Sequence, residues 1–326
     1  MSRKSWTYAQ LEGIVQAAAD FDNDIIITGT GVLRGTFPGL PDIDLVEHFG
    51  RYRVIDYSAI DEMWYNAAAL GSALIGVRAI SWHDMYMAVP YPFELISQHA
   101  AKLHHMTGGQ AKIPCVFRLA ISNQAPGMAG QHSDYEEDTW YAHIPGVKTV
   151  IPSTAYDAKG LMISAIRSGD PIVYFEPAAF RGLVEEVPDE PFEVPIGIAE
   201  VRTQGNDITI VGSGGSMPEI LDATERLANQ GVSVEVIDLR SLHPIDTETL
   251  VKSVQKTGKL LTVDQSKYTL CPGAEVIARV AEGVRGAAFK RIAYPDAPPP
   301  GAPEMFNWMR PNADHVYQAA TILLNA

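Results

Sequence analysis

The fold class is decided by residues 207–237, which read DITIVGSGGSMPEILDATERLANQGVSVEVI. A β-branched run, Asp207–Val211, leads through the glycine-rich turn Gly212–Gly215 into a helical pattern over Met217–Asn229, and a second β-branched run follows at Val232–Ile237. Two strands joined by a helix in this order are typical of a right-handed crossover between parallel strands. The stretch therefore predicts an α/β fold.

The same alternation continues on both sides of this unit. Strands are predicted at 24–28, 113–118, 171–175, 259–263 and 290–293, and helices at 62–75, 93–106, 157–168, 246–257 and 274–284. It is interrupted once, by VEEVPDEPFEVP at 184–195, where three prolines favour an extended connector over an element of a core. We therefore predict two tandem α/β sandwiches with mainly parallel sheets: a first domain at 1–183, a linker at 184–197 and a second domain at 198–326.

Composition excludes several classes of protein. Of the 326 residues 46% are hydrophobic, which argues against disorder, and the formal charge of −14 argues against binding to nucleic acid or to anionic membranes. The sequence has neither the ~18–20-residue apolar run of a membrane span nor the apolar stretch of a signal peptide. Cys115 and Cys271 lie far apart, which suits a reducing compartment. We expect a cytoplasmic protein.

Familiar motifs are weak or missing. Gly212–Gly215 could present backbone amides to a phosphate and Asp238 could bind a ribose, but the full dinucleotide motif is not there, so a tight turn is favoured over an NAD site. Neither a P-loop nor a G-x-S-x-G elbow occurs. The histidines lack metal-ligand spacing, and in Trp82-His83-Asp84 neighbouring side chains point to opposite faces of a strand. We expect packing or surface roles for them.

Two short segments could carry chemistry. Ser58-Ala-Ile-Asp-Glu62-Met begins a helix with acidic residues, where capping by Asp61 and the helix dipole would be a sufficient explanation. Ala125-Pro-Gly-Met-Ala-Gly-Gln-His132-Ser133 is a loop of small residues that carries one histidine. Each alone is compatible with a structural role.

Taken together and in order, these segments resemble the β subunit of 2-oxo-acid dehydrogenase E1 components. The resemblance runs from about residue 24 to the C-terminus and is carried by a set of motifs: Ile60-Asp-Glu62-Met, His99-Ala-Ala-Lys102, Met106-Thr-Gly-Gly-Gln110, Ile113-Pro-Cys-Val-Phe-Arg118, Gln131-His132-Ser133, Trp140-Tyr-Ala-His-Ile-Pro-Gly146, Ser153 with Asp157-Ala-Lys-Gly-Leu161, Val234-Glu-Val-Ile-Asp-Leu-Arg240, Asp246 and Lys256-Thr-Gly258.

The resemblance implies a transketolase-like pyrimidine-binding domain, a transketolase C-terminal domain and the cofactor thiamine diphosphate. In such enzymes a glutamate at the position of Glu62 hydrogen-bonds N1′ of the aminopyrimidine, so that the cofactor can lose its C2 proton. Ile60, Met63 and the Ala67–Ala69 face would form an apolar wall around Glu62. The aromatic residue that contacts the pyrimidine falls on Ala88, and Tyr86 could replace it. His132 matches the histidine that faces the reacting carbon.

The resemblance also implies a partner. The family holds the diphosphate and Mg²⁺ with a Gly-Asp-Gly motif on another domain, and this sequence contains no Gly-Asp-Gly. We therefore expect an α subunit that completes the site in an α2β2 assembly, with no metal ligand in this chain. Three departures lie near the expected substrate and acceptor: Thr28-Gly-Thr-Gly31 replaces an acidic segment, Asp134-Tyr-Glu-Glu-Asp138 is unusually acidic, and Gly301 stands where an aromatic residue is common.

The function predicted first is decarboxylation of a 2-oxo acid, or cleavage of a related donor, with transfer of the acyl unit to a lipoyl E2. Two alternatives stay open. One is a carboligase or transketolase-like enzyme that works without E2, and the other is a non-catalytic subunit that has kept the fold.

Overall fold

The structure, a computed structural model, describes residues 1–32, 43–57, 62–83, 90–121 and 138–326. The described residues divide into two compact units, one ending at Ile196 and one beginning at Gly197. The predicted class, α/β with mainly parallel sheets, is confirmed in both units.

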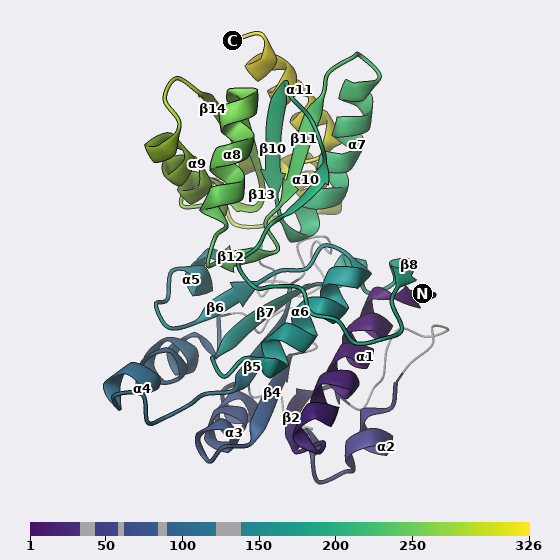
Figure 1. The fold of residues 1–326 in the computed structure, drawn as a ribbon, viewed down its shortest axis with the longest axis vertical. Coiled ribbons are helices and arrows are strands. Elements are labelled where there is room, and N and C mark those ends of the chain that lie inside the picture. The colour runs from purple at the N-terminus through teal and green to yellow at the C-terminus, as the bar shows by residue number, and fades with distance from the viewer. Residues whose placement is uncertain (33–42, 58–61, 84–89, 122–137) are drawn as a thin grey trace. The chain divides into compact units, whose positions relative to one another are not determined.

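Unit 1 is built on a parallel sheet in the order β6-β7-β5-β4-β2-β3 (Figure 1). The strands are β2 (Ile25–Thr30), β3 (Val54–Asp56), β4 (Arg78–His83), β5 (Cys115–Ile121), β6 (Lys148–Val150) and β7 (Ile172–Pro177). On one face, α1 (Trp6–Ala18) and α6 (Ala155–Arg167) pack side by side over a core that includes Trp6, Ile14 and Leu161. The continuous apolar runs of the strands suit a sheet that is covered on both faces.

Shorter helices complete unit 1: α2 (Leu45–Phe49), α3 (Glu62–Leu74), α4 (Ala101–Met106), α5 (Asp138–Ala142) and a 3-10 turn at Ala178–Phe180. The helix predicted over 93–106 is divided between a π-helical turn at Leu95–Ala100 and α4. Helix α1 was not predicted from the sequence. Its N-cap, Ser5, accepts a hydrogen bond from the Tyr8 amide, as a serine at this position commonly does.

The proline-rich segment is not merely a connector. β8 (Val184–Val187) pairs antiparallel with β1 (Ser2–Ser5), and Val187 and Val194 are buried in the core of unit 1. The expectation that these residues lie outside a core is therefore wrong. The reason is that the extended backbone that proline favours is also the conformation of a strand, and Pro188 comes directly after the last paired residue.

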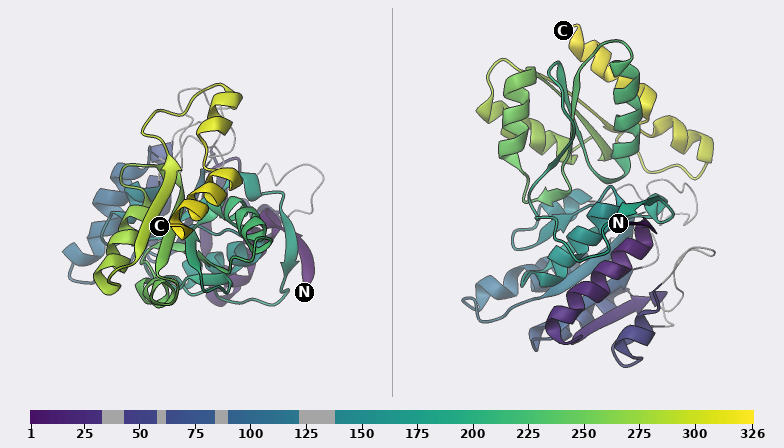
Figure 2. Two further views of the ribbon diagram at one scale, coloured as in Figure 1. Left: turned by 90° about the horizontal axis from the view of Figure 1, so that it is seen from above. Right: turned by 45° about the vertical axis from the view of Figure 1, so that its right-hand side comes forward.

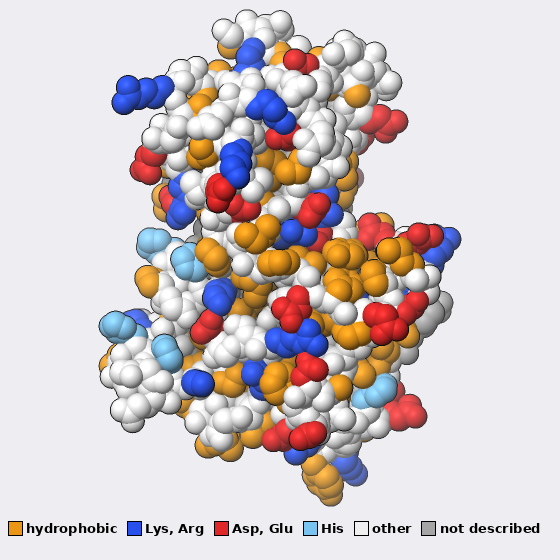
Figure 3. Space-filling view, in the orientation of Figure 1, with side chains coloured by type: hydrophobic (Ala, Val, Ile, Leu, Met, Phe, Trp, Pro, Cys, Tyr) orange, Lys and Arg blue, Asp and Glu red, His pale blue; other side chains and the backbone are white. Residues whose placement is uncertain are grey.

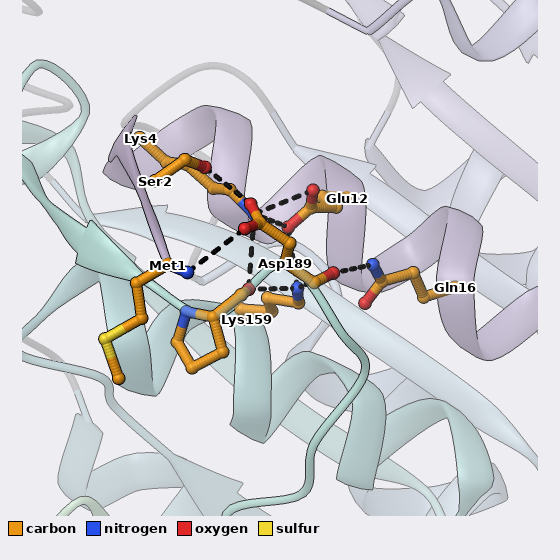
Figure 4. A network of polar contacts seen from close by, with 8 residues as sticks. Met1, Ser2, Lys4, Glu12, Gln16, Lys159 and Asp189 are labelled. Atoms are coloured by element: carbon orange, nitrogen blue, oxygen red, sulfur yellow. Dashed lines mark hydrogen bonds and ion pairs between the residues drawn. The ribbon is translucent and has the colours of Figure 1, made fainter.

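Buried charges tie this segment to the helices (Figure 4). The Glu12 carboxylate on α1 forms ion pairs with Lys4 and Lys159, with Nζ–Oε2 distances of 2.6 and 2.7 Å. Lys159 Nζ also donates to the Pro188 carbonyl at 2.7 Å. Nearby Tyr156 stacks on Phe192 with ring centroids 4.3 Å apart, and hydrophobic side chains stay on the surface beside β8 (Figure 3). Residues 184–194 are thus fixed to unit 1 by charge and by packing.

Unit 2 contains a second sheet with helices packed against it (Figure 2, right). Its strands follow the order β14-β13-β10-β11-β9 and are parallel except at β9. Its strands are β9 (Glu200–Thr203), β10 (Ile208–Gly212), β11 (Val234–Asp238), β13 (Lys259–Lys267) and β14 (Ala288–Tyr294). α7 (Met217–Ala228) and α11 (Ala313–Leu324) share one core, and α8 (Thr247–Thr257) and α9 (Pro272–Gly283) pack together beside the sheet. β12 (Ser241–His243), α10 (Pro303–Met309) and a 3-10 turn at Gly214–Ser216 complete the unit.

Two further features concern membrane spans and cysteines. Within the described ranges, no helix combines the length and the apolar character that a membrane span needs. Cys115 and Cys271 are both free and both buried.

Candidate functional site

The carboxyl edge of the sheet in unit 1 is where the described part of the candidate site lies, because Glu62 follows β3 in the chain. β2, β3, β4 and β5 run parallel, so the segments that follow them leave the sheet at the same edge. In open α/β sheets this edge is where ligands bind. Ile60, Tyr86 and His132 belong to those following segments by sequence, but all three lie outside the described residues, as does Ala88. Glu62 is described.

Glu62 is the first residue of α3 and is only 8% exposed. Among the residues that the structure describes, none hydrogen-bonds to its carboxylate. A helix N-terminus favours a negative charge at this position. Within the described ranges no cluster of His, Cys, Asp and Glu could hold a metal ion.

The expected apolar wall around Glu62 is only partly correct. Met63 is 37% exposed and Ala67 is also exposed, so both lie on the outer face of α3, away from Glu62. The helix has 3.6 residues per turn, and its buried residues are Glu62, Tyr65, Asn66, Ala69, Leu70 and Ala73. The side chains beside Glu62 on the described part of the helix are therefore an aromatic ring and an amide as well as an alanine.

Sequence reasoning missed a buried polar network on this face. Asn66 Nδ2 lies 2.7 Å from His83 Nε2 and also donates to the Glu62 carbonyl, and Ser81 Oγ donates to Asn66 Oδ1 at 2.6 Å. The Tyr65 hydroxyl lies 3.0 Å from His83 Nδ1. Burial, together with the charge of Arg118, lowers the pKa of His83 to about 3, so this imidazole is neutral at physiological pH.

A second buried network, made of ion pairs between Glu176 and the arginines Arg118 and Arg181, links β5 to β7. Arg118 on β5 pairs with Glu176 on β7, donates to the His83 carbonyl at 3.0 Å and lies 3.6 Å from the Trp82 ring centroid. Burial alone would raise the pKa of Glu176, but Arg118 and Arg181 outweigh it and hold that pKa below its usual value. These charges are satisfied by one another, so we assign them to structure.

Two of the segments that differ from the family pattern, Thr28–Gly31 and Gly301, are among the described residues. At Gly29 a Cβ would lie 2.0 Å from the Trp82 carbonyl oxygen, so the Thr28–Gly31 segment has no room for a larger residue at that point. Thr28 donates to the Tyr65 carbonyl at 2.7 Å and so holds α3 against β2. Gly301 is exposed, and a Cβ there would meet nothing.

The glycine-rich turn of unit 2 is a tight strand-to-helix connection, as favoured from its sequence. Ser213 and Ser216 cap the short turn that leads into α7, and a Cβ on Gly212 would lie 2.4 Å from Ile220. Asp238 is fully buried and bound by Arg202 at 2.7 Å, so it is already occupied within the chain. The geometry gives a dinucleotide site no support.

Comparison with known proteins adds independent findings. Residues 4–179 match the family described as transketolase, pyrimidine binding domain, and residues 197–316 match transketolase, C-terminal domain. The chain is 36% identical over 310 residues to the pyruvate dehydrogenase E1 component subunit beta of Staphylococcus epidermidis, with 93% of each chain covered.

Two further relatives carry a different name. The acetoin:2,6-dichlorophenolindophenol oxidoreductase subunit beta of Bacillus subtilis is 33% identical and covers 86% of this chain and 82% of its own length. Its counterpart in Cupriavidus necator is 34% identical, with 93% and 87% covered. A solved structure titled split gene transketolase, inactive beta4 tetramer, matches with a TM-score of 0.78 at 18% identity over 97% of each chain, a likeness that concerns the fold alone.

Proposed function

This chain belongs to the family of β subunits of 2-oxo-acid dehydrogenase E1 components, and on that premise we propose that it is the pyrimidine-binding subunit of a heteromeric thiamine-diphosphate enzyme. The reaction is decarboxylation of a 2-oxo acid, or cleavage of a related donor, with transfer of the acyl unit to a lipoyl E2. The observation that carries the proposal is Glu62, an acidic residue that opens α3, is only 8% exposed and bonds through its carboxylate to none of the described residues.

Glu62 fits one half of the cofactor. An aminopyrimidine presents ring nitrogens and an amino group, and a buried carboxylate at a helix start can hold a proton against such a ring nitrogen. When bound, thiamine diphosphate supplies a nucleophilic carbon, and this chain supplies the proton relay at Glu62. Ile60 and Tyr86 would line the pyrimidine, and His132 would handle acid–base work beside the substrate.

The other half of the cofactor site is assigned to an α subunit, which would hold the diphosphate and Mg²⁺ in an α2β2 assembly. The outer face of α3 supports this partner, because its exposed residues are all apolar: Met63, Trp64, Ala67, Gly71 and Leu74. Trp64 is 57% exposed, and a Cβ on Gly71 would meet nothing. Large apolar side chains beside small residues suit close packing against a second helix. Cytoplasmic location completes the proposal, in keeping with the two free cysteines.

The acceptor has two candidates. The relatives include a pyruvate dehydrogenase component and acetoin oxidoreductases, which favours a dehydrogenase with a lipoyl acceptor. The acidic run that contains Asp134, Glu136, Glu137 and Asp138 favours the alternative, a small-molecule acceptor without E2, because it would repel an acidic lipoyl domain. Acceptor kinetics at rising ionic strength distinguish them: efficient acylation of an acidic lipoyl domain at low salt, unimproved by added salt, would remove the alternative.

The Glu62→Gln variant tests the core of the proposal. It keeps the shape and a hydrogen bond but removes the proton relay, so exchange of the cofactor C2 proton in the reconstituted complex should slow by about 10²–10⁴-fold. Exchange is measured by hydrogen–deuterium quench. The matched control is Asp264→Asn in unit 2, which should leave exchange unchanged. Wild-type exchange in Glu62→Gln would overturn the proposal.

A second experiment tests the partner. In calorimetry the chain alone should bind thiamine diphosphate and Mg²⁺ negligibly and should bind them after the α subunit is added. Gly71→Leu should weaken association with the α subunit while leaving the thermal stability of the free chain unchanged or raised. Gly169→Leu is the control, since Gly169 is also exposed with nothing near its Cβ but lies outside α3. Tight stoichiometric cofactor binding by the isolated chain would contradict the assignment.

A further inference from the structure

The buried network on the inner face of α3 has a fixed direction. Ser81, Asn66 and His83 are fully buried, and Tyr65 is 1% exposed, so water is excluded from their polar atoms. Each of them must therefore satisfy its donors and acceptors within the protein. The only ambiguity is which nitrogen or oxygen of the amide and of the imidazole faces which neighbour.

The Glu62 carbonyl decides the orientation of the Asn66 amide. A backbone carbonyl can only accept, so the amide atom that faces it must be the Nδ2 donor. The Oδ1 atom then accepts the hydroxyl hydrogen of Ser81 at 2.6 Å. Nδ2 carries two hydrogens, of which one goes to the Glu62 carbonyl and the other points at His83 Nε2, 2.7 Å away.

The Asn66 amide in turn decides the tautomer of His83. Because Nδ2 donates to it, Nε2 must be an acceptor without a hydrogen. The neutral ring then carries its hydrogen on Nδ1 and donates to the Tyr65 hydroxyl oxygen at 3.0 Å. The direction of donation thus runs from Ser81 through Asn66 and His83 to Tyr65.

We propose that Asn66 and His83 are positioning residues for Glu62: they bind the first turn of α3 to the carboxyl end of β4, with His83 held as the Nδ1–H tautomer. This inference rests on the proposed role of Glu62 in the cofactor site. Asn66 connects the carbonyl of the residue that carries the carboxylate to the last residue of β4. A displacement of about 1 Å in a catalytic group can reduce turnover by about 10²-fold, so such a connection matters to the rate.

The tautomer is tested first on the full chain, without cofactor. With ¹⁵N-labelled histidine, the His83 ring should show a protonated Nδ1 and an unprotonated Nε2, and the signals are assigned by their loss in His83→Gln. Asn66→Asp should exchange the two patterns, because a carboxylate accepts a hydrogen from Nε2 and leaves Nδ1 to accept from Tyr65. A protonated Nε2 in the wild-type chain would overturn the network direction.

The positioning role is tested in the complex reconstituted with the α subunit. Asn66→Leu removes the amide while filling a similar volume, and it should lower kcat by about 10–100-fold with little change in KM for the 2-oxo acid. Asn66→Asp keeps the bond from Ser81 but loses the donor to the Glu62 carbonyl, and it should likewise lower kcat with little change in KM. The control is Thr209→Val in unit 2, which breaks buried hydrogen bonds to Ser253 and Thr257 and should change stability but not kcat.

The outcomes separate this inference from the proposed function. If Glu62→Gln slows C2-proton exchange while Asn66→Leu exchanges at the wild-type rate, the positioning role fails and the function stands. If Glu62→Gln exchanges at the wild-type rate, the proposed function fails, and with it the role assigned to Asn66, while the tautomer measurement still stands on its own. A fall in kcat in Thr209→Val equal to that in Asn66→Leu would show that lost stability alone explains the effect.

Discussion

The carboxyl ends of the two parallel sheets both carry acidic residues, but these residues differ in whether the described part of the chain supplies their hydrogen-bond partners. In unit 2 Asp238 at the end of β11 is bound by Arg202, and Asp264 near the end of β13 accepts from the Gly273 amide in the first turn of α9 at 3.2 Å. In unit 1 Glu62, also in the first turn of a helix, has no such partner among the described residues. In unit 2 these carboxylates are thus held by bonds within the chain, whereas in unit 1 the described residues offer no bond to the Glu62 carboxylate.

Removal of a carboxylate held in this way should have the largest effect on stability. Asp238→Ala removes a fully buried carboxylate that accepts from Arg202 at 2.7 Å and from the Arg240 amide at 3.2 Å, and removing one member of a buried ion pair costs about 3–5 kcal/mol. Urea unfolding of unit 2, followed by the fluorescence of a tryptophan in that unit such as Trp308, measures the loss. A loss of unfolding free energy below about 1 kcal/mol would mean that the bonds to Asp238 contribute little, so that unit 2 would not differ from unit 1 in this respect.

Asp264 gives the comparison a pH dependence. Burial raises the pKa of Asp264 from its ordinary value of 3.8 to about 6, so between these values the folded chain retains a proton that the unfolded chain has released. Stability from this group is therefore lost as pH rises from about 4 through 6, by up to about 3 kcal/mol. Asp264→Asn cannot titrate. The difference in unfolding free energy between wild type and variant, measured from pH 4 to 7, should fall accordingly, and a constant difference would contradict the prediction.

Glu62 should behave in the opposite way to Asp238. No described residue bonds to the Glu62 carboxylate, so Glu62→Gln breaks no bond to the described residues and should leave the free chain as stable as wild type or more stable by about 1 kcal/mol. Thermal unfolding without cofactor is the measurement. A marked loss of stability would reveal an internal partner for Glu62, so that unit 1 would not differ from unit 2 in this respect.

The smallest effect is expected at Gly71. A glycine within a helix is about 0.5–1 kcal/mol less stable than alanine, and nothing would contact the added Cβ. Gly71→Ala should therefore raise the melting temperature of the free chain slightly. Gly13, where a Cβ would lie 2.9 Å from the Lys159 carbonyl oxygen, is the contrasting helical glycine, and Gly13→Ala should be destabilising.

Local patterns explain what could be predicted. β10, α7 and β11 follow one another within about thirty residues, so their β-branched runs and the amphipathic helix were enough to predict an α/β fold. The place of Glu62 at a helix start is local as well. α1 was missed although its buried residues, among them Trp6, Ala9, Gly13 and Ala17, recur at helical spacing after a serine cap. That signal was available in the sequence.

Contacts between distant residues explain what could not be predicted. His83 was expected to pack or to lie on the surface, and its partners Tyr65 and Asn66 come from a different element, brought to it by the way α3 lies on β4. The opposite faces of α3 were also misjudged at Met63 and Ala67, because an apolar helix gives little indication of which side is buried. The role of His132 is a proposal, since that residue lies outside the described ranges.

The pairing of β1 with β8 affects how unit 1 is made. Ser5 meets Val184, and α1 packs on α6, so contacts of the first twenty residues join partners synthesised more than a hundred residues later. Contacts so far apart in sequence raise the contact order and slow folding. On the ribosome, the apolar face of α1, with Trp6, Leu11 and Ile14, has to wait for α6 and β8 to emerge. A nascent helix with that face uncovered is a ready substrate for chaperones.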